Sequence, residues 1–186
     1  MLTLILYSEK NDNSFIRIFE RNLKRYYRVY AIEEEQIEMS GKGKDLLFLN
    51  SSRLSKISGG PTILVVQPGA DLSGLSHITG NVIALAHSSS FVQLEKLAQQ
   101  HVPTVVCGMS SLDTVTFSSF RDTSSIVSLQ RTVENPEGKV VEPMEVLVEP
   151  GSFYDPVSIL LYTAAMMITG AFSQGETETE SIKYIV

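Results

Sequence analysis

Cysteine is nearly absent from this sequence, since Cys107 is the only one in 186 residues. A single cysteine cannot form an intramolecular disulfide, and it cannot supply the several thiolates of a cysteine-rich zinc site. Histidine is also scarce, and His77, His87 and His101 show none of the spacings typical of metal ligands. We therefore expect no bound metal, and the sequence offers no motif for another cofactor.

The sequence also lacks an excess of basic over acidic residues. The chain has 15 basic and 21 acidic side chains, which gives a net charge of −6. Nucleic acids and anionic membranes attract basic surfaces, so this balance disfavours both as partners. We expect no nucleic-acid partner.

Long hydrophobic runs are absent as well. A bilayer span needs about 20 mostly apolar residues, but the longest apolar run, Val157 to Phe172, is interrupted by serine, threonines, tyrosine and glycine. The apolar start at 2–7 is too short for a signal peptide and has no basic segment before it. We expect no membrane association and a cytoplasmic location.

Hydrophobic residues make up 43% of the sequence and charged residues 19%, which suffices for a packed core. The length suits one domain. We predict a single α/β domain over residues 1–172, followed by a polar acidic C-terminal tail over 173–186.

Short apolar runs alternate with helical patterns in the first half of the chain. Strands are predicted at 2–7, 29–32, 45–49, 62–66, 82–86 and 103–107. Helical spacing follows Asp12-Asn13-Ser14, and it returns after Ser90 with an apolar stripe of Phe91, Leu94, Leu97 and Ala98. Residues 33–44 read as a polar connection, with Gly41 to Lys44 as a solvated loop. This order predicts a mostly parallel central sheet flanked by helices on both faces.

The second half has a different pattern. Strand-like stretches at 114–117, 126–133 and 139–148, with a turn at 135–138, predict an antiparallel β-hairpin extension. Asp155-Pro156 opens a last helix, with Asp as N-cap and Pro at the first position. Helix 156–172 is apolar nearly all round, which predicts burial under other elements or in a subunit contact. We therefore expect a protein partner or a homo-oligomer through helix 156–172.

Residues Asn81 to Ser119 resemble the later half of the ATP-binding central domain of the Mur ligases and folylpolyglutamate synthases. Their strand ending at His87-Ser88-Ser89, the next helix, and the strand leading into Gly108-Met109-Ser110 follow that family's order of elements. The predicted hairpin and the helix ending at Gly170 also resemble the end of that family's central domain. The resemblance covers about half the chain, and it implies a P-loop-NTPase-like architecture.

The family's phosphate-binding loop is missing. It has the form Gly-x-Asn-Gly-Lys-Thr/Ser between the first strand and helix, whereas residues 7–14 contain no glycine and add Glu9 and Asp12. Glycines let successive backbone N–H groups approach a phosphate. The resemblance thus implies a degenerate Mur-ligase-like pseudoenzyme and assigns no catalytic residue here. Ser8, Lys10, Asn13 and Ser14 are the candidates for any ligand contact in this segment.

The leading hypothesis is therefore a non-catalytic binding or regulatory module, since no intact phosphate loop, metal site or catalytic triad is present. The alternative is a small-molecule-binding domain or enzyme that uses strand-end loops around Cys107 and His87, with Gly108 and Ser110. Cys107 also fits a plain core residue. A third reading places nucleotide phosphates on the basic helix face of Arg17, Arg21 and Lys24.

Overall fold

The computed structural model describes residues 1–8, 13–32, 37–121, 124–149, 155–172 and 182–183. These residues form one large mixed sheet, a separate two-stranded hairpin and three helices, α1 (Asn13–Tyr26), α2 (Phe91–Gln99) and α3 (Pro156–Thr169). The strands are β1 (Leu2–Tyr7), β2 (Tyr27–Ile32), β3 (Ile37–Gly41), β4 (Lys44–Ser51), β5 (Lys56–Val66), β6 (His77–His87), β7 (Thr104–Gly108), β8 (Val115–Phe120), β9 (Ser125–Leu129), β10 (Val133–Glu134), β11 (Val140–Val141), β12 (Met144–Glu149) and β13 (Ile182–Lys183).

The sheet is mainly parallel, as predicted. Its strand order is β13-β12-β9-β8-β7-β6-β5-β1-β4-β2-β3. The run from β8 to β2 pairs in parallel throughout, while β3 joins one side and β9 and β12 join the other in antiparallel pairing. The hairpin extension is also confirmed, because β9 pairs with β12 and β10 with β11. The turn predicted at 135–138 lies between β10 and β11.

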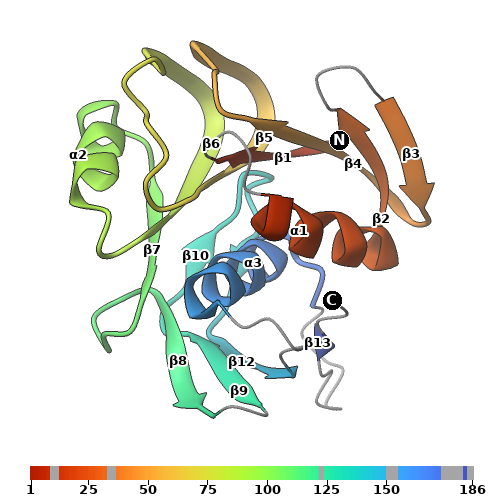
Figure 1. Ribbon diagram of the computed structural model, residues 1–186, viewed down its shortest axis with the longest axis vertical. Helices are drawn as coiled ribbons and strands as arrows, with labels where there is room; N and C mark the ends of the chain where they lie inside the picture. Colours follow the sequence, from red (N-terminus) through yellow and green to blue (C-terminus); the bar gives the residue numbers. More distant parts are fainter. Residues whose placement is uncertain (9–12, 33–36, 122–123, 150–154, 173–181, 184–186) are drawn as a thin grey trace.

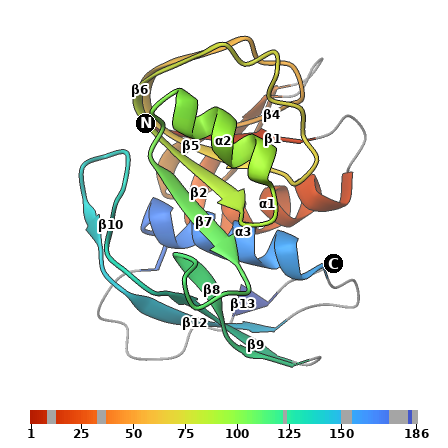
Figure 2. The same ribbon diagram turned by 90° about the vertical axis from the view of Figure 1, so that its left-hand side faces the viewer.

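The sheet curls around α3. Figures 1 and 2 show β5, β6 and β7 on one side of this helix and β8, β9 and β12 on the other. Successive strand residues point to opposite faces, so Leu4 and Leu6 of β1 face α1 and α3, while Ile5 and Tyr7 face away. The helix-filled concave side holds the larger of two apolar cores.

Phe19 of α1 joins the elements of this larger core. Its ring centroid lies 5.4 Å from Phe15, 5.3 Å from Tyr162 of α3 and 6.3 Å from Phe48 of β4. These edge-on and stacked rings tie α1 to both α3 and the sheet. The amphipathic spacing read from the sequence therefore places α1 correctly.

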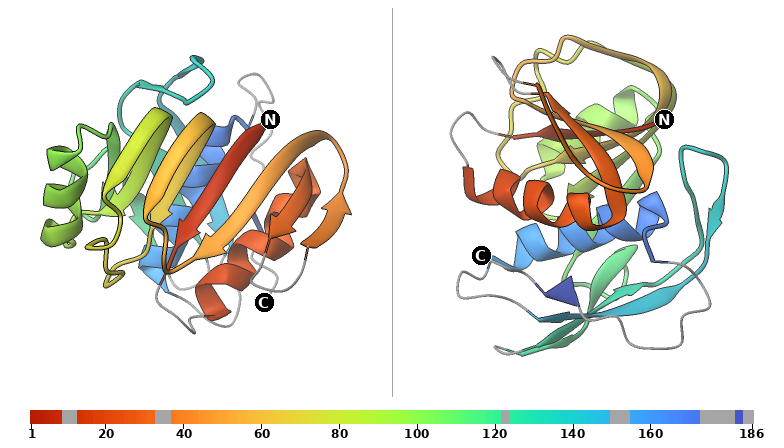
Figure 3. Two further views of the ribbon diagram at one scale, coloured as in Figure 1. Left: turned by 90° about the horizontal axis from the view of Figure 1, so that it is seen from above. Right: turned by 90° about the vertical axis from the view of Figure 1, so that its right-hand side faces the viewer.

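Fewer elements pack on the opposite face of the sheet. Figure 3 (left) looks onto it, with α1 and α3 behind the strands and α2 at the left-hand side. The smaller core combines Leu97 of α2 with loop residues such as Leu72 and Leu75 and with the sheet. Helices thus lie on both faces, as predicted, but α2 alone cannot cover this one.

Helix α3 begins and ends as its sequence predicts. The Asp155 carboxylate accepts hydrogen bonds from the backbone N–H groups of Val157 and Ser158, at 3.2 and 3.1 Å, and Gly170 takes a left-handed conformation after the last turn. Side chains of Tyr27 and Asn135 donate to carbonyl groups of the last turn, each at 3.2 Å. Both ends of the buried helix are therefore satisfied.

Of the two expectations for helix 156–172, the structure shows burial under other elements. Every residue from Ser158 to Thr169 is buried within the chain itself. The curled sheet supplies the apolar partners that an all-round apolar helix needs.

Two local predictions are corrected. Residues 37–41 are a strand, β3, and not part of a loop; the turn after them is tight, because Gly41 (φ 85°) lies against the carbonyl groups of Tyr27 and Lys24, leaving no room for a Cβ. In α2, Phe91 and Ala98 of the predicted stripe are exposed and Gln93 is buried.

At the C-terminal end, the short strand Ile182–Lys183 pairs with β12, and the other residues after 172 lie outside the described part of the chain. None of the helices in the described residues is long and apolar enough to cross a membrane.

Candidate functional site

The carboxyl ends of the parallel strands gather the polar residues singled out from the sequence. Ser8 follows β1 and is buried, and its hydroxyl donates to the Asn50 side chain at the end of β4, at 2.9 Å. The Ser8 N–H donates to the Ser51 carbonyl, at 3.3 Å. Ser8 therefore joins two strand ends and has a structural role. Lys10 and the side chains of Asn13 and Ser14 lie outside the described part of the chain.

His87, Cys107, Gly108 and Ser110 do come together, as the alternative hypothesis expects. His87 ends β6 directly beside Cys107 of β7, and the Ser88 N–H donates to the Cys107 carbonyl, at 2.8 Å. At Gly108, a Cβ atom would collide with the Ser88 hydroxyl and the Asp113 carboxylate. Glycine at 108 thus allows two loops to close over the ends of β6 and β7.

Cys107 is not placed for nucleophilic chemistry. Its side chain is fully buried in the larger core. Burial raises the pKa of the thiol far above its usual range, and the nearby Asp113 adds to the effect. A thiolate is the reactive form of cysteine, so this residue is a core side chain. The expectation that Cys107 lines an accessible pocket is therefore wrong.

The loop after β7 closes on itself. Asp113 is buried and accepts a hydrogen bond from the Ser110 N–H, at 2.9 Å, while the Ser110 hydroxyl accepts from the Leu112 N–H, at 3.2 Å. Backbone groups that could hold an anion are thus used within the turn. Ser110 therefore stabilises the loop.

His87 keeps an unusual position beside this loop. Its Nδ1 atom lies 2.7 Å from the Ser89 hydroxyl oxygen and accepts from the Ser89 N–H, at 3.3 Å. Its Nε2 atom is buried and has no hydrogen-bond partner among the residues that the structure describes. Burial lowers the pKa of His87, and the negative charges of Asp113 and Asp155 partly oppose this shift. The neutral imidazole is therefore favoured near neutral pH.

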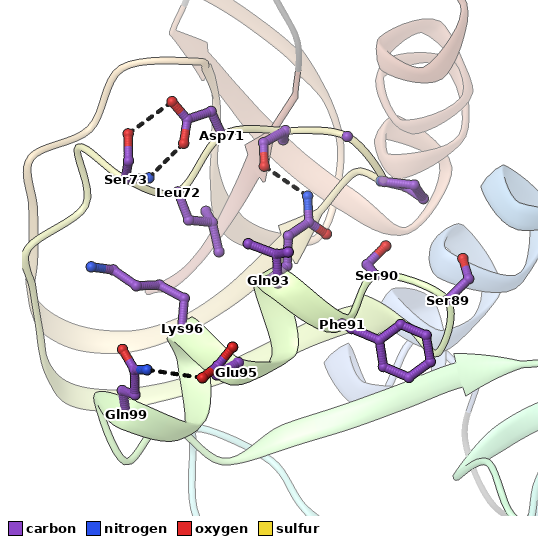
Figure 4. A pocket seen from close by; sticks show the side chains of 14 residues that line it. Asp71, Leu72, Ser73, Ser89, Ser90, Phe91, Gln93, Glu95, Lys96 and Gln99 are labelled. Atoms are coloured by element: carbon purple, nitrogen blue, oxygen red, sulfur yellow. Dashed lines mark hydrogen bonds between the residues drawn. The ribbon is translucent and has the colours of Figure 1, made fainter.

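A groove that the sequence did not reveal runs along α2. It has a volume of about 800 Å³ and lies between the loop 68–73 and the helix (Figure 4). Gln93 holds the two walls together, because its amide donates to the carbonyl groups of Gln67 and Ala70, at 2.9 and 2.7 Å. Asp71 folds the loop further by accepting two bonds from Ser73, each at 2.8 Å. The groove therefore has a fixed shape.

Large apolar side chains stand exposed at the same edge. Phe91 and Val92 begin α2 with 77% and 80% of their surfaces exposed, and Met109 and Leu112 follow β7 with 57% and 82%. Because Ser88 contacts both Cys107 and Gly108, the segments that carry these four residues leave the sheet side by side. We call these four residues the edge patch.

The basic helix face does not form a phosphate site. Arg21 and Lys24 line a small cavity of about 250 Å³ between α1 and β3, but Glu20 and Glu38 line it as well. Two carboxylates beside two cations leave little net charge for a phosphate. Among the described residues, no cluster of His, Cys, Asp or Glu could hold a metal ion.

The comparison with solved structures finds 20 matching chains, and MurF is among them. The crystal structure of MurF from Acinetobacter baumannii aligns with 91% of this chain and 42% of that protein, at 10% identity and a TM-score of 0.44. This chain thus spans less than half the length of MurF. No family model matches the sequence, and no curated protein matches it. The likeness concerns the course of the chain and says nothing about activity.

Proposed function

We propose that this chain is a non-catalytic binding module that recognises a protein partner at the carboxyl edge of its sheet. The observation that carries the proposal is the edge patch, in which a phenylalanine, a valine, a methionine and a leucine stand exposed beside an open groove. Exposed apolar groups of this size on a folded chain typically mark interaction sites.

The energetics favour a protein over a small molecule. Small-molecule sites enclose most of their ligand, whereas this groove is open along α2 (Figure 4). Burying a phenylalanine side chain contributes about 1.5–3 kcal/mol. Around Phe91, polar groups of Ser89, Ser90 and Lys96 line the groove and can form the hydrated rim of an interface.

The patch also rests on rigid support. Leu97 anchors α2 in the smaller core, and Gln93 ties the first turn of the helix to loop 68–73. A preorganised surface loses little conformational entropy when a partner binds. This rigidity supports the role of Phe91 and Val92 as fixed anchors.

The sequence before α1 supports the non-catalytic part of the proposal. Residues 7–14 lack glycine and carry two acidic side chains where a triphosphate loop would stand. We expect no heat of binding when Mg-ATP is titrated into the protein. Micromolar binding with turnover would overturn this part.

A photo-crosslinking experiment tests the partner. The photoreactive amino acid benzoylphenylalanine replaces Phe91 in one variant and Val140, an exposed residue of the β10–β11 hairpin, in a control. In extract of the source cells, we expect one discrete cross-linked protein from position 91 and none from 140. Equal patterns from both positions would contradict the proposed site.

A second candidate function rests on the pair of His87 and Ser89. A serine hydroxyl 2.7 Å from a neutral imidazole, open to the groove, is the arrangement of an activated nucleophile. A fluorophosphonate probe tests it. Labelling of the wild type that is lost in both Ser89→Ala and His87→Ala would favour an enzyme. An unlabelled wild type would rule out this second candidate and favour the binding module.

A further inference from the structure

Strand β3 is an uncapped edge of the large sheet. It pairs with β2 only, within the residues that the structure describes, and all five of its residues are exposed. The outward N–H and C=O groups of such a strand can pair with another strand. Figure 3 shows β3 as the outermost strand, beyond β2 and β4.

Of the usual protections of an edge strand, β3 has only its short length and the single charge of Glu38. Edge strands typically carry proline, lysine or a bulge that blocks pairing. β3 reads Ile-Glu-Met-Ser-Gly and pairs with β2 in unbroken register from Ile37 to Gly41. Its two large apolar side chains, Ile37 and Met39, are 74% and 68% exposed.

The neighbouring strands extend this apolar surface. Ile37 and Met39 stand opposite Ile32 and Tyr30 of β2, and Tyr30 stands opposite Leu47 of β4. Paired residues share a face of the sheet. Tyr30, Ile32 and Leu47 are only partly buried and belong to neither core. The face that α2 does not reach therefore remains open up to the edge.

We propose that β3 pairs with β3 of a second copy, antiparallel and around a two-fold axis, so that the two sheets become one. With Met39 opposite Met39, Ile37 lies opposite Gly41 and Glu38 opposite Ser40. No like charges stand directly opposite each other, and the small Gly41 and Ser40 leave room for the larger side chains. The strand is thus complementary to its own antiparallel copy.

The charges favour this partner and this direction. Glu38 lies near the start of β3, and Lys42 follows directly after its end. An antiparallel copy sets the acidic start of each strand toward the basic end of the other, twice in one dimer. A parallel arrangement would set like charges side by side. Pairing also joins the two open faces of Tyr30, Ile32, Ile37, Met39 and Leu47 into one apolar surface across the axis.

This dimer does not depend on the proposed function. β3 ends the sheet at one side, while β6 and β7 lie near its middle, and the edge patch belongs to the segments that follow these two strands. Both edge patches therefore stay accessible in the dimer. It would offer two binding sites for one partner type, which raises avidity for a multivalent partner.

A cysteine variant tests the register directly. Cα atoms opposite each other in an antiparallel pair lie about 4.5–5.5 Å apart, which suits a disulfide. The native Cys107 is buried and does not interfere. We expect Met39→Cys to form a covalent dimer rapidly under mild oxidation, while the control Met109→Cys, also exposed, remains monomeric on the same timescale.

Sedimentation velocity of the wild type and Met39→Lys completes the test. We expect the wild type to sediment as a dimer at micromolar concentration and Met39→Lys as a folded monomer, with Val140→Lys remaining a dimer. A monomeric wild type would overturn the proposal. So would a dimer that Met39→Lys leaves intact, or a β3 edge that captures a different protein in place of a second copy.

Discussion

The side chains with the most reactive chemistry at the carboxyl edge are used to hold the fold. Ser8 bonds to Asn50, and the carboxylate of Asp113 closes the turn after β7. Cys107 fills space in the core. His87 forms a polar contact with Ser89, and Ser89 lines the groove. At the scale of single residues, the edge is therefore better suited to recognition than to covalent chemistry.

Cys107 provides the first prediction at this scale. Because its thiol is fully buried and its pKa is raised, we expect modification by a maleimide at neutral pH to be no faster than global unfolding. Mass spectrometry over time measures the rate. The double variant Cys107→Ala with Ser111→Cys, whose new thiol sits on the exposed loop, is the matched control and reacts at once. Comparable rates for the two proteins would show that the thiol is accessible.

His87 predicts a pH dependence of stability. Its pKa is lowered from 6.5 by burial, so the unfolded chain binds the proton more tightly than the folded one. The free energy of unfolding therefore falls as the pH drops through about 6.5, and above that value the contribution is fully present. Urea denaturation at about pH 7.5 and about pH 5.5 measures the loss.

Substitution identifies His87 as the source of that loss. We expect His87→Gln to reduce the difference in unfolding free energy between the two pH values. The same change at the exposed His77 is the control and leaves the difference as in the wild type. An unchanged difference in His87→Gln would contradict the assignment.

At the scale of elements, helix α3 depends on its N-cap. Replacing Asp155 by Ala removes the acceptor for two backbone N–H groups, so we expect a loss of about 1 kcal/mol in the free energy of unfolding. Asp155→Asn keeps an acceptor oxygen and is expected to lose far less. Chemical denaturation measures the free energy of unfolding of both variants. An equal loss of stability in the two would show that the charge of Asp155, and not its hydrogen bonds to the helix start, stabilises α3.

Elements with strong local signals could be predicted from the sequence. Asp155-Pro156 at one end and Gly170 at the other defined α3, and short apolar runs at 62–66 and 82–86 located the later parts of β5 and β6. β3 was missed because its polar surroundings, Glu33 to Glu35 and Gly41 to Lys44, made the whole segment read as a connection, although Ile37 and Met39 alternate with polar residues. The buried face of α2 was misjudged because Gln93 is fixed by carbonyl groups of a distant loop, which no periodicity reveals.

The candidate site was harder to predict for the same reason. The sequence brought His87, Cys107, Gly108 and Ser110 together correctly, since they end neighbouring parallel strands. It could not show that Cys107 points into the core. Nor could it show that Phe91, read as a core residue, stands exposed at the start of α2. Orientation around a strand end or a helix start depends on tertiary packing.

At the scale of the whole molecule, the two faces of the sheet differ. The concave face encloses α3 and carries α1, whereas the other face is covered in part by α2 and loops (Figure 3). Most of the buried apolar residues therefore lie on the concave face, and apolar surface stays exposed on the other face. The edge patch and the β3 edge both belong to the less covered part.

The most direct measurement is the affinity of the cross-linked partner for the wild type, Phe91→Ser and Val140→Ser. Phe91 is exposed, so its replacement should leave the fold intact, as circular dichroism can check. We expect Phe91→Ser to weaken binding at least about tenfold, as for an anchor residue, and Val140→Ser to bind like the wild type. Equal affinity for all three proteins would contradict recognition at the carboxyl edge.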